Sequence, residues 1–166
     1  MTPIDRFNAQ HLARAEAQLL ACCGSYTWAS RLAAHRPYLN VDQLIHKGEA
    51  LWSTLTEADW LEAFSHHPRI GEKKAPTTAF LASSVAEQEV AQSSLDQVAV
   101  ALTRANREYE DKFQFRYIVF ASGRSAPELL DILNHRLTRT REEELHEAAR
   151  QQLLITNLRL RKWLQP

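Results

Sequence analysis

The sequence has few of the residues on which several large classes of enzyme depend. Only four of its 166 residues are glycine, which leaves no room for a glycine-rich phosphate-binding loop. The G-x-S-x-G motif of α/β hydrolases is absent, and so is the H-E-x-x-H spacing of zinc proteases. The common nucleotide-binding, serine-hydrolase and zinc-protease motifs are therefore excluded.

Cysteine is scarce as well. Cys22 and Cys23 are the only two, and they are neighbours in an apolar stretch. A disulfide between adjacent residues is strained and rare, and no Cys-x-x-Cys pair is available for zinc or redox chemistry. Cysteines in such a stretch are more often part of a hydrophobic core than nucleophiles. We therefore expect a reducing, cytoplasmic location.

Neither sign of charge is in excess, since Lys+Arg and Asp+Glu both total 20. Affinity for a nucleic acid backbone depends on clustered Lys and Arg, so a nucleic acid partner is not expected. No apolar run approaches the roughly 20 residues that span a bilayer, and the N-terminal MTPIDRFNAQ lacks the pattern of a signal peptide. A membrane partner is therefore not expected either.

Helical periodicity, by contrast, runs along most of the chain. The expected helices cover residues 4–24, 25–37, 41–55, 56–67, 84–112, 125–137 and 141–164. Residues 113–123 are rich in aromatic and β-branched side chains, but no second convincing strand is present to pair with them. We expect a buried extended segment or short helix there, within a compact single-domain all-α bundle of about seven to eight helices over residues 1–166.

Several helix ends carry recognisable signals. Gly24 is expected to end the first helix. Thr56, with Asp59 at the third helical position, is expected to cap the fourth helix, and Ser125 with Glu128 forms a capping box of the same kind. The segment from residue 68 to residue 82 has no periodicity and is expected to be a loop.

Two histidines stand side by side before a proline, in the order His66, His67 and Pro68. On a helix their side chains would point about 100° apart, so they could not easily share one metal ion, and no metal site is expected. A residue before proline is displaced from the α region, so His67 should leave the helical face at the exit. By pattern alone, His67 is more simply a surface or capping histidine, and His66 is interpreted as structural.

The segment SVAEQ, residues 84–88, has two interpretations. Ser84 and Glu87 form a capping box, in which each side chain bonds to the backbone of the other. The N–H groups at a helix N-terminus also bind anions, so the same turn could hold a carboxylate or a ureido group. The pattern alone favours the cap.

The C-terminal LRLRKWL contains two candidate arginines, Arg159 and Arg161. Their Cβ directions differ by about 200° on a helix, so only Arg159 shares a face with the apolar Ile155. Arginines of this kind are usually solvated. One that turned inward would bind a substrate carboxylate.

Several motifs follow one another in an order that is more specific than any one of them. They are HPRIGEK (67–73), S-x-x-E-Q (84–88), N-x-x-Y-x-x-K-F-x-F (106–115), IVFASG (118–123), NHRL (134–137) and LRL (158–160). In this order and spacing the chain resembles the decarboxylases of 2-oxo-4-hydroxy-4-carboxy-5-ureidoimidazoline (OHCU), which catalyse the third step from urate to allantoin. It departs from the family at Gln114, where the family usually has glycine, and at residues 91–93, where the family commonly has Ala-Gly-Leu.

The resemblance implies an all-α homodimer that converts OHCU to (S)-allantoin and CO2 without a metal or an organic cofactor. It implies that His67 is the catalytic base and that Glu87 and Arg159 also take part in catalysis. The substrate-binding residues that it implies are Pro68, Ser84, Gln88, Ile118, Val119, Phe120, Ala121 and Ser122. Two alternatives stay open: a non-catalytic helical interaction module that docks through its last helix, and a different cofactor-free lyase or hydrolase on the same scaffold.

Overall fold

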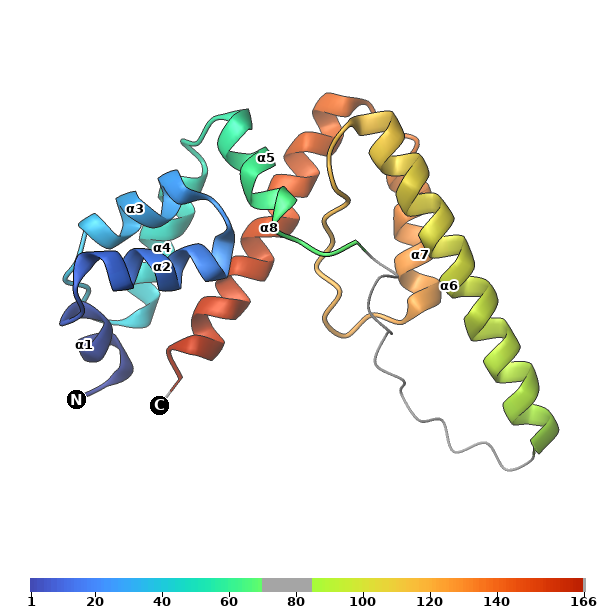
Figure 1. Cartoon of the computed structure of the whole chain (residues 1–166), viewed down its shortest axis with the longest axis horizontal. Helices are drawn as coiled ribbons and strands as arrows, with labels where there is room; N and C mark the ends of the chain where they lie inside the picture. Colours follow the sequence, from blue (N-terminus) through green and yellow to red (C-terminus); the bar gives the residue numbers. More distant parts are fainter. Residues whose placement is uncertain (70–84, 166) are drawn as a thin grey trace. The chain divides into compact units, whose positions relative to one another are not determined.

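A computed structural model describes residues 1–69 and 85–165 of the chain, the side chains of residues 85–93 excepted (Figure 1). Across these residues it contains eight α-helices and no strand, so the expected all-α class is confirmed. The helices are α1 (Pro3–Asn8), α2 (Leu12–Cys23), α3 (Tyr26–Ala34), α4 (Val41–Trp52), α5 (Glu57–Ser65), α6 (Val85–Phe113), α7 (Ala126–Arg136) and α8 (Arg141–Trp163).

The chain divides into two compact units. Unit 1 consists of Met1–His67, Ile118–Phe120 and Glu147–Pro166, and unit 2 consists of Pro68–Tyr117 and Ala121–His146. Helix α8 therefore begins in unit 2 and supplies most of its length to unit 1. The single domain expected over the whole chain stays a prediction.

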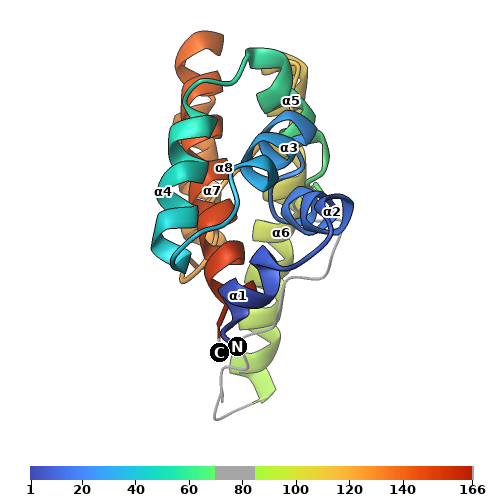
Figure 2. The same ribbon diagram turned by 90° about the vertical axis from the view of Figure 1, so that its left-hand side faces the viewer.

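Aromatic side chains hold the helices of unit 1 together. The ribbons of α1 to α4, which belong to this unit, face the viewer in Figure 2. The indole N–H of Trp28, on α3, donates to the carbonyl of Gly48 on α4 at 2.8 Å. A Cβ on Gly48 would come within 3.1 Å of the Trp28 ring, which is tighter than most such contacts, so glycine favours the close approach of the two helices. The indole N–H of Trp52 reaches α8 at the Ala149 carbonyl, 3.0 Å away. Helix α8 is thus part of the core of unit 1.

The first expected helix, over residues 4–24, is wrong as a single element because the chain breaks between α1 and α2. The break coincides with three backbone carbonyls that accept from one guanidinium. Arg36 Nη1 donates to the carbonyls of Phe7 at 2.9 Å, Asn8 at 3.5 Å and Gln10 at 2.8 Å. In a continuous helix these carbonyls would accept from N–H groups four residues further on. The side chain of Arg36, which lies just after the end of α3, takes over part of that role.

Other expected helix ends are confirmed. Gly24 ends α2 with a left-handed φ of 87°. Thr56 caps α5 through a capping box with Asp59, and Ser125 caps α7 through a capping box with Glu128. Helix α6 continues unbroken to Phe113 and has 29 residues, so it is longer than α8, which has 23.

The segment between α6 and α7 contains neither helix nor strand, as the extended-segment prediction required. It begins at Gln114, whose φ is +63°. This is the left-handed region, which favours glycine, and it is the position at which the sequence departs from the glycine usual in the family. The chain therefore carries a strained residue at the point where it leaves α6.

Replacing Gln114 with glycine is expected to stabilise the protein by about 0.5–1 kcal/mol. The left-handed conformation costs a residue with a Cβ roughly 1–2 kcal/mol, and the greater flexibility of glycine in the unfolded chain offsets part of that gain. Urea unfolding measures the difference. Gln114→Ala keeps the Cβ and should gain nothing, so a glycine variant no more stable than the alanine variant would contradict this account.

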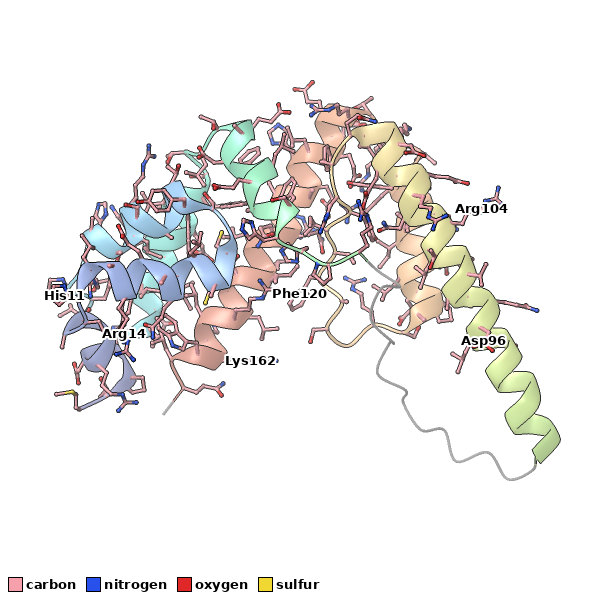
Figure 3. All side chains as sticks on the ribbon, in the orientation of Figure 1. His11, Arg14, Asp96, Arg104, Phe120 and Lys162 are labelled. Carbon is pink, nitrogen blue, oxygen red and sulfur yellow. The ribbon has the colours of Figure 1, made fainter. Side chains whose placement is uncertain are left out.

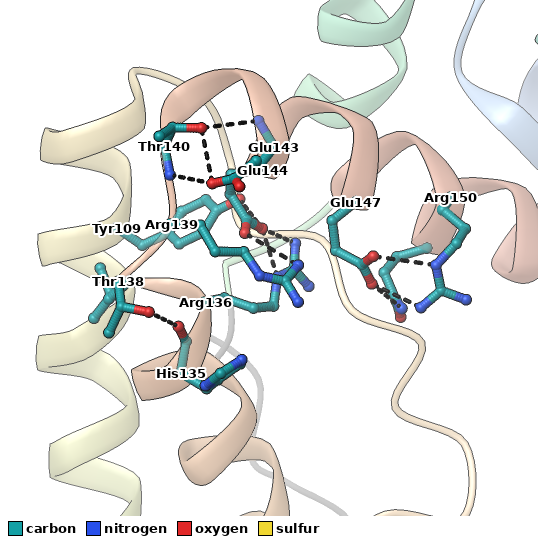
Figure 4. Close-up of polar contacts among 12 residues, drawn as sticks. Tyr109, His135, Arg136, Thr138, Arg139, Thr140, Glu143, Glu144, Glu147 and Arg150 are labelled. Carbon is teal, nitrogen blue, oxygen red and sulfur yellow. Dashed lines mark hydrogen bonds and ion pairs between the residues drawn. The ribbon is translucent and has the colours of Figure 1, made fainter.

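Unit 2 contains a buried ion pair between α7 and the first turn of α8 (Figure 4). The side chains of Arg136 and Glu144 are 3% and 0% exposed, and Arg136 Nε donates to Glu144 Oε1 at 2.5 Å. The hydroxyl of Tyr109, on α6, donates to the same oxygen at 2.8 Å. The Arg136 guanidinium also lies 4.6 Å from the centroid of the Tyr117 ring. Burial raises the pKa of Tyr117 to about 12, so this ring stays a neutral phenol at physiological pH.

Candidate active site

The two adjacent histidines follow directly after helix α5. His66 is the C-terminal cap of that helix, and its Nδ1 lies 3.0 Å from the carbonyl oxygen of Glu62. A carbonyl oxygen only accepts hydrogen bonds, so the Nδ1 of His66 carries the proton. His66 thus has the structural role expected of it, since it satisfies a carbonyl in the last turn of the helix.

His67 points elsewhere. Its side chain is half-buried, and its Nε2 lies 2.6 Å from the Oε1 of Gln152 on α8. Gln152 is fully buried, with 0% of its side chain exposed. The backbone N–H of His67 donates to the carbonyl of Phe64 at 3.1 Å, which ties the residue to the last turn of α5. The imidazole therefore has a fixed place in unit 1.

Further contacts of Gln152 fix the direction of this hydrogen bond. The Nε2 of Gln152 donates to the carbonyl of Cys23 at 3.3 Å and to the hydroxyl oxygen of Thr156 at 3.1 Å. Reversing the amide would set its oxygen against the Cys23 carbonyl, which cannot donate. The amide oxygen must therefore face His67 and accept from it, so Nε2 of His67 carries a proton.

The neighbouring Gln151 supports a second part of the expected site. Its Oε1 accepts from the backbone N–H of Phe120 at 2.7 Å, and its Nε2 donates to Glu147 at 2.8 Å. Phe120 lies on the extended segment, where Figure 3 labels it. Two consecutive residues of α8 thus hold the imidazole of His67 and the backbone of the segment that contains Ile118, Val119 and Phe120.

The two candidate arginines occupy different faces of α8. Arg159 Nη1 donates to the carbonyl of Cys22 at 3.1 Å, next to the Cys23 carbonyl that accepts from Gln152. Arg161 Nη1 lies 2.9 Å from the carboxylate of Asp42, on α4. Arg159 is therefore the arginine on the Gln152 face, about two helical turns further along.

Cys22 and Cys23 belong to the core, as expected. They are 7% and 1% exposed, and neither forms a disulfide. Burial raises the pKa of Cys22, with Arg159 acting in the opposite direction, and it raises the pKa of Cys23 to about 12. Both are therefore thiols at physiological pH and are poor nucleophiles.

The structure describes some of the other expected site residues and not the rest. Pro68, Ala121 and Ser122 are exposed residues of unit 2. Ser84 lies outside the described residues. Glu87 and Gln88 fall in the first turns of α6, in the part whose side chains are not described.

Metal and membrane sites can be tested only where side chains are described. In that part of the chain, no three His, Cys, Asp or Glu side chains are grouped so that they could hold a metal ion. In the same part, no helix combines the length and the apolar character that crossing a bilayer requires.

Fold and site together define an all-α protein in which the imidazole of His67 is held by a buried glutamine. The chain belongs to the OHCU decarboxylase family, whose model matches residues 8–161. A family of this name is one of carboxy-lyases.

The Gln152 contact of His67 was missed by sequence reasoning, since no motif sets this glutamine apart from its neighbour Gln151.

The names of two relatives are consistent with this family. The chain is 37% identical over 145 residues to the "Uric acid degradation bifunctional protein TTL" of Arabidopsis thaliana, covering 85% of this chain and 44% of that protein. It is 29% identical over 134 residues to the "Uric acid degradation bifunctional protein PucL" of Bacillus subtilis (strain 168), covering 80% of this chain and 26% of that protein. The chain thus spans less than half the length of these two relatives.

Solved structures share the fold. A crystal structure of OHCU decarboxylase in the presence of (S)-allantoin is 33% identical, with a TM-score of 0.70, over 86% of this chain and 94% of that chain. A crystal structure of (S)-allantoin synthase is 18% identical, with a TM-score of 0.71, over 99% of this chain and 54% of that chain. At that identity the second likeness concerns the fold alone.

Proposed function

We propose that the chain decarboxylates OHCU to (S)-allantoin and CO2, the third step from urate to allantoin, without a metal or organic cofactor. The observation that carries the proposal is the fixed imidazole of His67 in a chain that matches the OHCU decarboxylase family over residues 8–161. The names of the two bifunctional relatives, which refer to uric acid degradation, support the choice of substrate. So does the (S)-allantoin named with the solved OHCU decarboxylase.

The chemistry of the substrate suits a protein without a cofactor. OHCU carries a hydroxyl and a carboxylate on one ring carbon, next to a carbon–nitrogen double bond. When the bond to the carboxylate breaks, its electron pair moves into the ring and is delocalised onto that nitrogen. The substrate therefore supplies its own electron sink, and the protein has to move protons and position the ring.

His67 is proposed as the base that takes or orients the hydroxyl proton. Because Nε2 of His67 already carries a proton and donates to Gln152, the lone pair of the neutral imidazole lies on Nδ1. Removing the hydroxyl proton promotes loss of CO2 and leaves an enediolate-like species. Stereoselective protonation of that species then gives (S)-allantoin.

Other residues are proposed to bind the substrate. Arg159 would hold an anionic oxygen through its guanidinium, together with backbone N–H groups of the segment 118–122, in which the N–H of Phe120 donates to Gln151. From the family resemblance, Glu87 and Gln88 would accept from the ureido and ring N–H groups. Ser84 and Pro68 are assigned to substrate binding by the same resemblance.

We also propose a cytoplasmic homodimer. The two buried free thiols of Cys22 and Cys23 suit a reducing compartment. The dimer comes from the family resemblance alone. Sedimentation velocity of the purified chain measures its mass in solution, and a monomer at micromolar concentration would exclude this part of the proposal.

One assay tests the function as a whole. Freshly generated OHCU is mixed with the protein in the presence of EDTA, while CO2 release and the optical activity of the allantoin are followed. The proposal requires rapid CO2 release and accumulation of (S)-allantoin, with the same rate whether or not EDTA is present. Racemic allantoin at the uncatalysed rate would instead favour a non-catalytic interaction module, and a rate lost on chelation would require a metal.

Glu87→Gln separates the functional interpretation of SVAEQ from the capping interpretation. If Glu87 fixes the substrate, turnover should fall by about 10- to 100-fold, because the loss of one charged acceptor costs roughly 1.5–3 kcal/mol. Glutamine still supports a capping box, so the melting temperature should change little. Steady-state kinetics and thermal unfolding of the same preparation give both values. Intact turnover would leave Glu87 as a cap and nothing more.

A further inference from the structure

We propose that Gln152 is a positioning residue for the base: it fixes the tautomer of His67, so that the proton is accepted at Nδ1. This inference rests on the proposed function, because it presupposes that His67 acts as the base. It concerns a residue that does not itself touch the substrate.

The geometry gives Gln152 one orientation. Its side chain is fully buried and makes three hydrogen bonds, to the His67 imidazole, the Cys23 carbonyl and the Thr156 hydroxyl. The last two contacts use the amide nitrogen as donor, so the amide oxygen is left to accept from His67. A buried amide with three defined partners cannot turn over without breaking all three bonds. The oxygen facing His67 is therefore a fixed acceptor.

Other histidines of the chain show the opposite arrangement. His35, His46 and His66 each place Nδ1 within 3.0 Å of the backbone carbonyl four residues earlier, at 2.7, 2.8 and 3.0 Å respectively. Those contacts favour a proton on Nδ1. His67, with its proton on Nε2, is the reverse of its immediate neighbour His66. The hydrogen bond to Gln152 on α8 favours the Nε2–H tautomer of the proposed base.

A neutral amide suits this role. When Nδ1 takes a proton, the imidazole becomes a cation whose Nε2–H still donates to the Gln152 oxygen, and that hydrogen bond becomes stronger. The bond thus steadies the ring before and after proton transfer. A carboxylate in its place would stabilise the cation far more and would hold the proton that the base has to give back.

The first test is Gln152→Met, which keeps the volume of the side chain and removes its acceptor. We expect kcat to fall by about 10- to 100-fold with KM changed by less than about twofold, because the base is misplaced while substrate binding is kept. Asn157→Ala is the matched control on the same helix. It removes a 2.7 Å hydrogen bond to Glu49 on α4 and should lower stability without changing kcat.

A second measurement does not depend on turnover. ¹⁵N-labelled histidine in the wild-type protein, observed above the pH at which the imidazole titrates, reports which ring nitrogen carries the proton. The His67 signal, assigned by its loss in His67→Ala, should show a single Nε2–H form with a proton protected from solvent exchange. In Gln152→Met that protection should be lost and the Nδ1–H form should appear.

The outcomes distinguish this inference from the proposed function. Wild-type His67 with its proton on Nδ1, or a Gln152→Met protein with wild-type kcat, would overturn the role of Gln152 and leave the decarboxylase proposal standing. Full activity in His67→Ala would overturn the catalytic assignment of His67 itself. A fall in kcat in Asn157→Ala equal to that in Gln152→Met would show that any weakening of α8 has this effect, and would also overturn the inference.

Discussion

His67→Ala is expected to lose nearly all decarboxylation, with kcat/KM lower by about 10²- to 10⁴-fold, the range in which a general base contributes. The fold should persist, because His67 is half-buried and the truncation leaves the capping box of α5 and its packing in place. The measurement is CO2 release from fresh OHCU, with circular dichroism to confirm that the helices remain. An active His67→Ala protein would remove the catalytic assignment.

His66→Ala is the control for this experiment. His66 bonds to the Glu62 carbonyl at the end of α5 and is exposed, so its loss should lower stability slightly and leave turnover unchanged. The two variants alter adjacent residues of one sequence motif. A large loss of activity in His67→Ala but not in His66→Ala would therefore show that the loss comes from the catalytic site and not from a disturbed helix end.

Arg136→Met is expected to destabilise the protein by about 3–5 kcal/mol, the largest effect on stability among the changes considered. Removing the arginine leaves the carboxylate of Glu144 buried at 0% exposure, with Tyr109 as its neutral hydrogen-bond donor. Arg139 is a weak substitute, because its Nη1 lies 3.9 Å from Glu144. Urea unfolding followed by circular dichroism measures the loss.

Two further variants decide whether the uncompensated charge is the cause. The double variant Arg136→Met/Glu144→Leu replaces both ions by apolar side chains and should recover most of the lost stability. Arg104→Ala, which breaks the exposed pair between Arg104 and Glu108 on α6, should change stability little. If the double variant is no more stable than Arg136→Met alone, the loss came from packing and not from the charge.

Local signals in the sequence account for much of the fold. The capping boxes of Thr56 and Ser125 and the left-handed Gly24 could be predicted because each depends on residues within one turn of the helix end. The break between α1 and α2 could not be predicted. It involves the guanidinium of Arg36, which lies up to 29 residues away in sequence. Helical periodicity does not depend on such a distant contact.

The candidate site, too, could be predicted from the sequence only in part. The place of His67 at a helix exit follows from Pro68, and the separation of Arg159 from Arg161 follows from helix geometry. The partner of Arg161 could not be predicted, because Asp42 lies 119 positions away in the chain. Gln152 itself gave no signal, because an adjacent pair of glutamines in an apolar run has no periodic or motif character. Its importance comes from contacts that only the folded chain makes.

The contacts between α2 and α8 have a consequence for the order of folding. The Cys23 and Cys22 carbonyls receive their donors from Gln152 and Arg159, which are 129 and 137 residues later in the chain. During synthesis from the N-terminus, α1 to α5 emerge long before these donors exist. Such long-range closure slows folding relative to helical proteins whose contacts are local. The support of the His67 imidazole therefore cannot form until α8 has been synthesised.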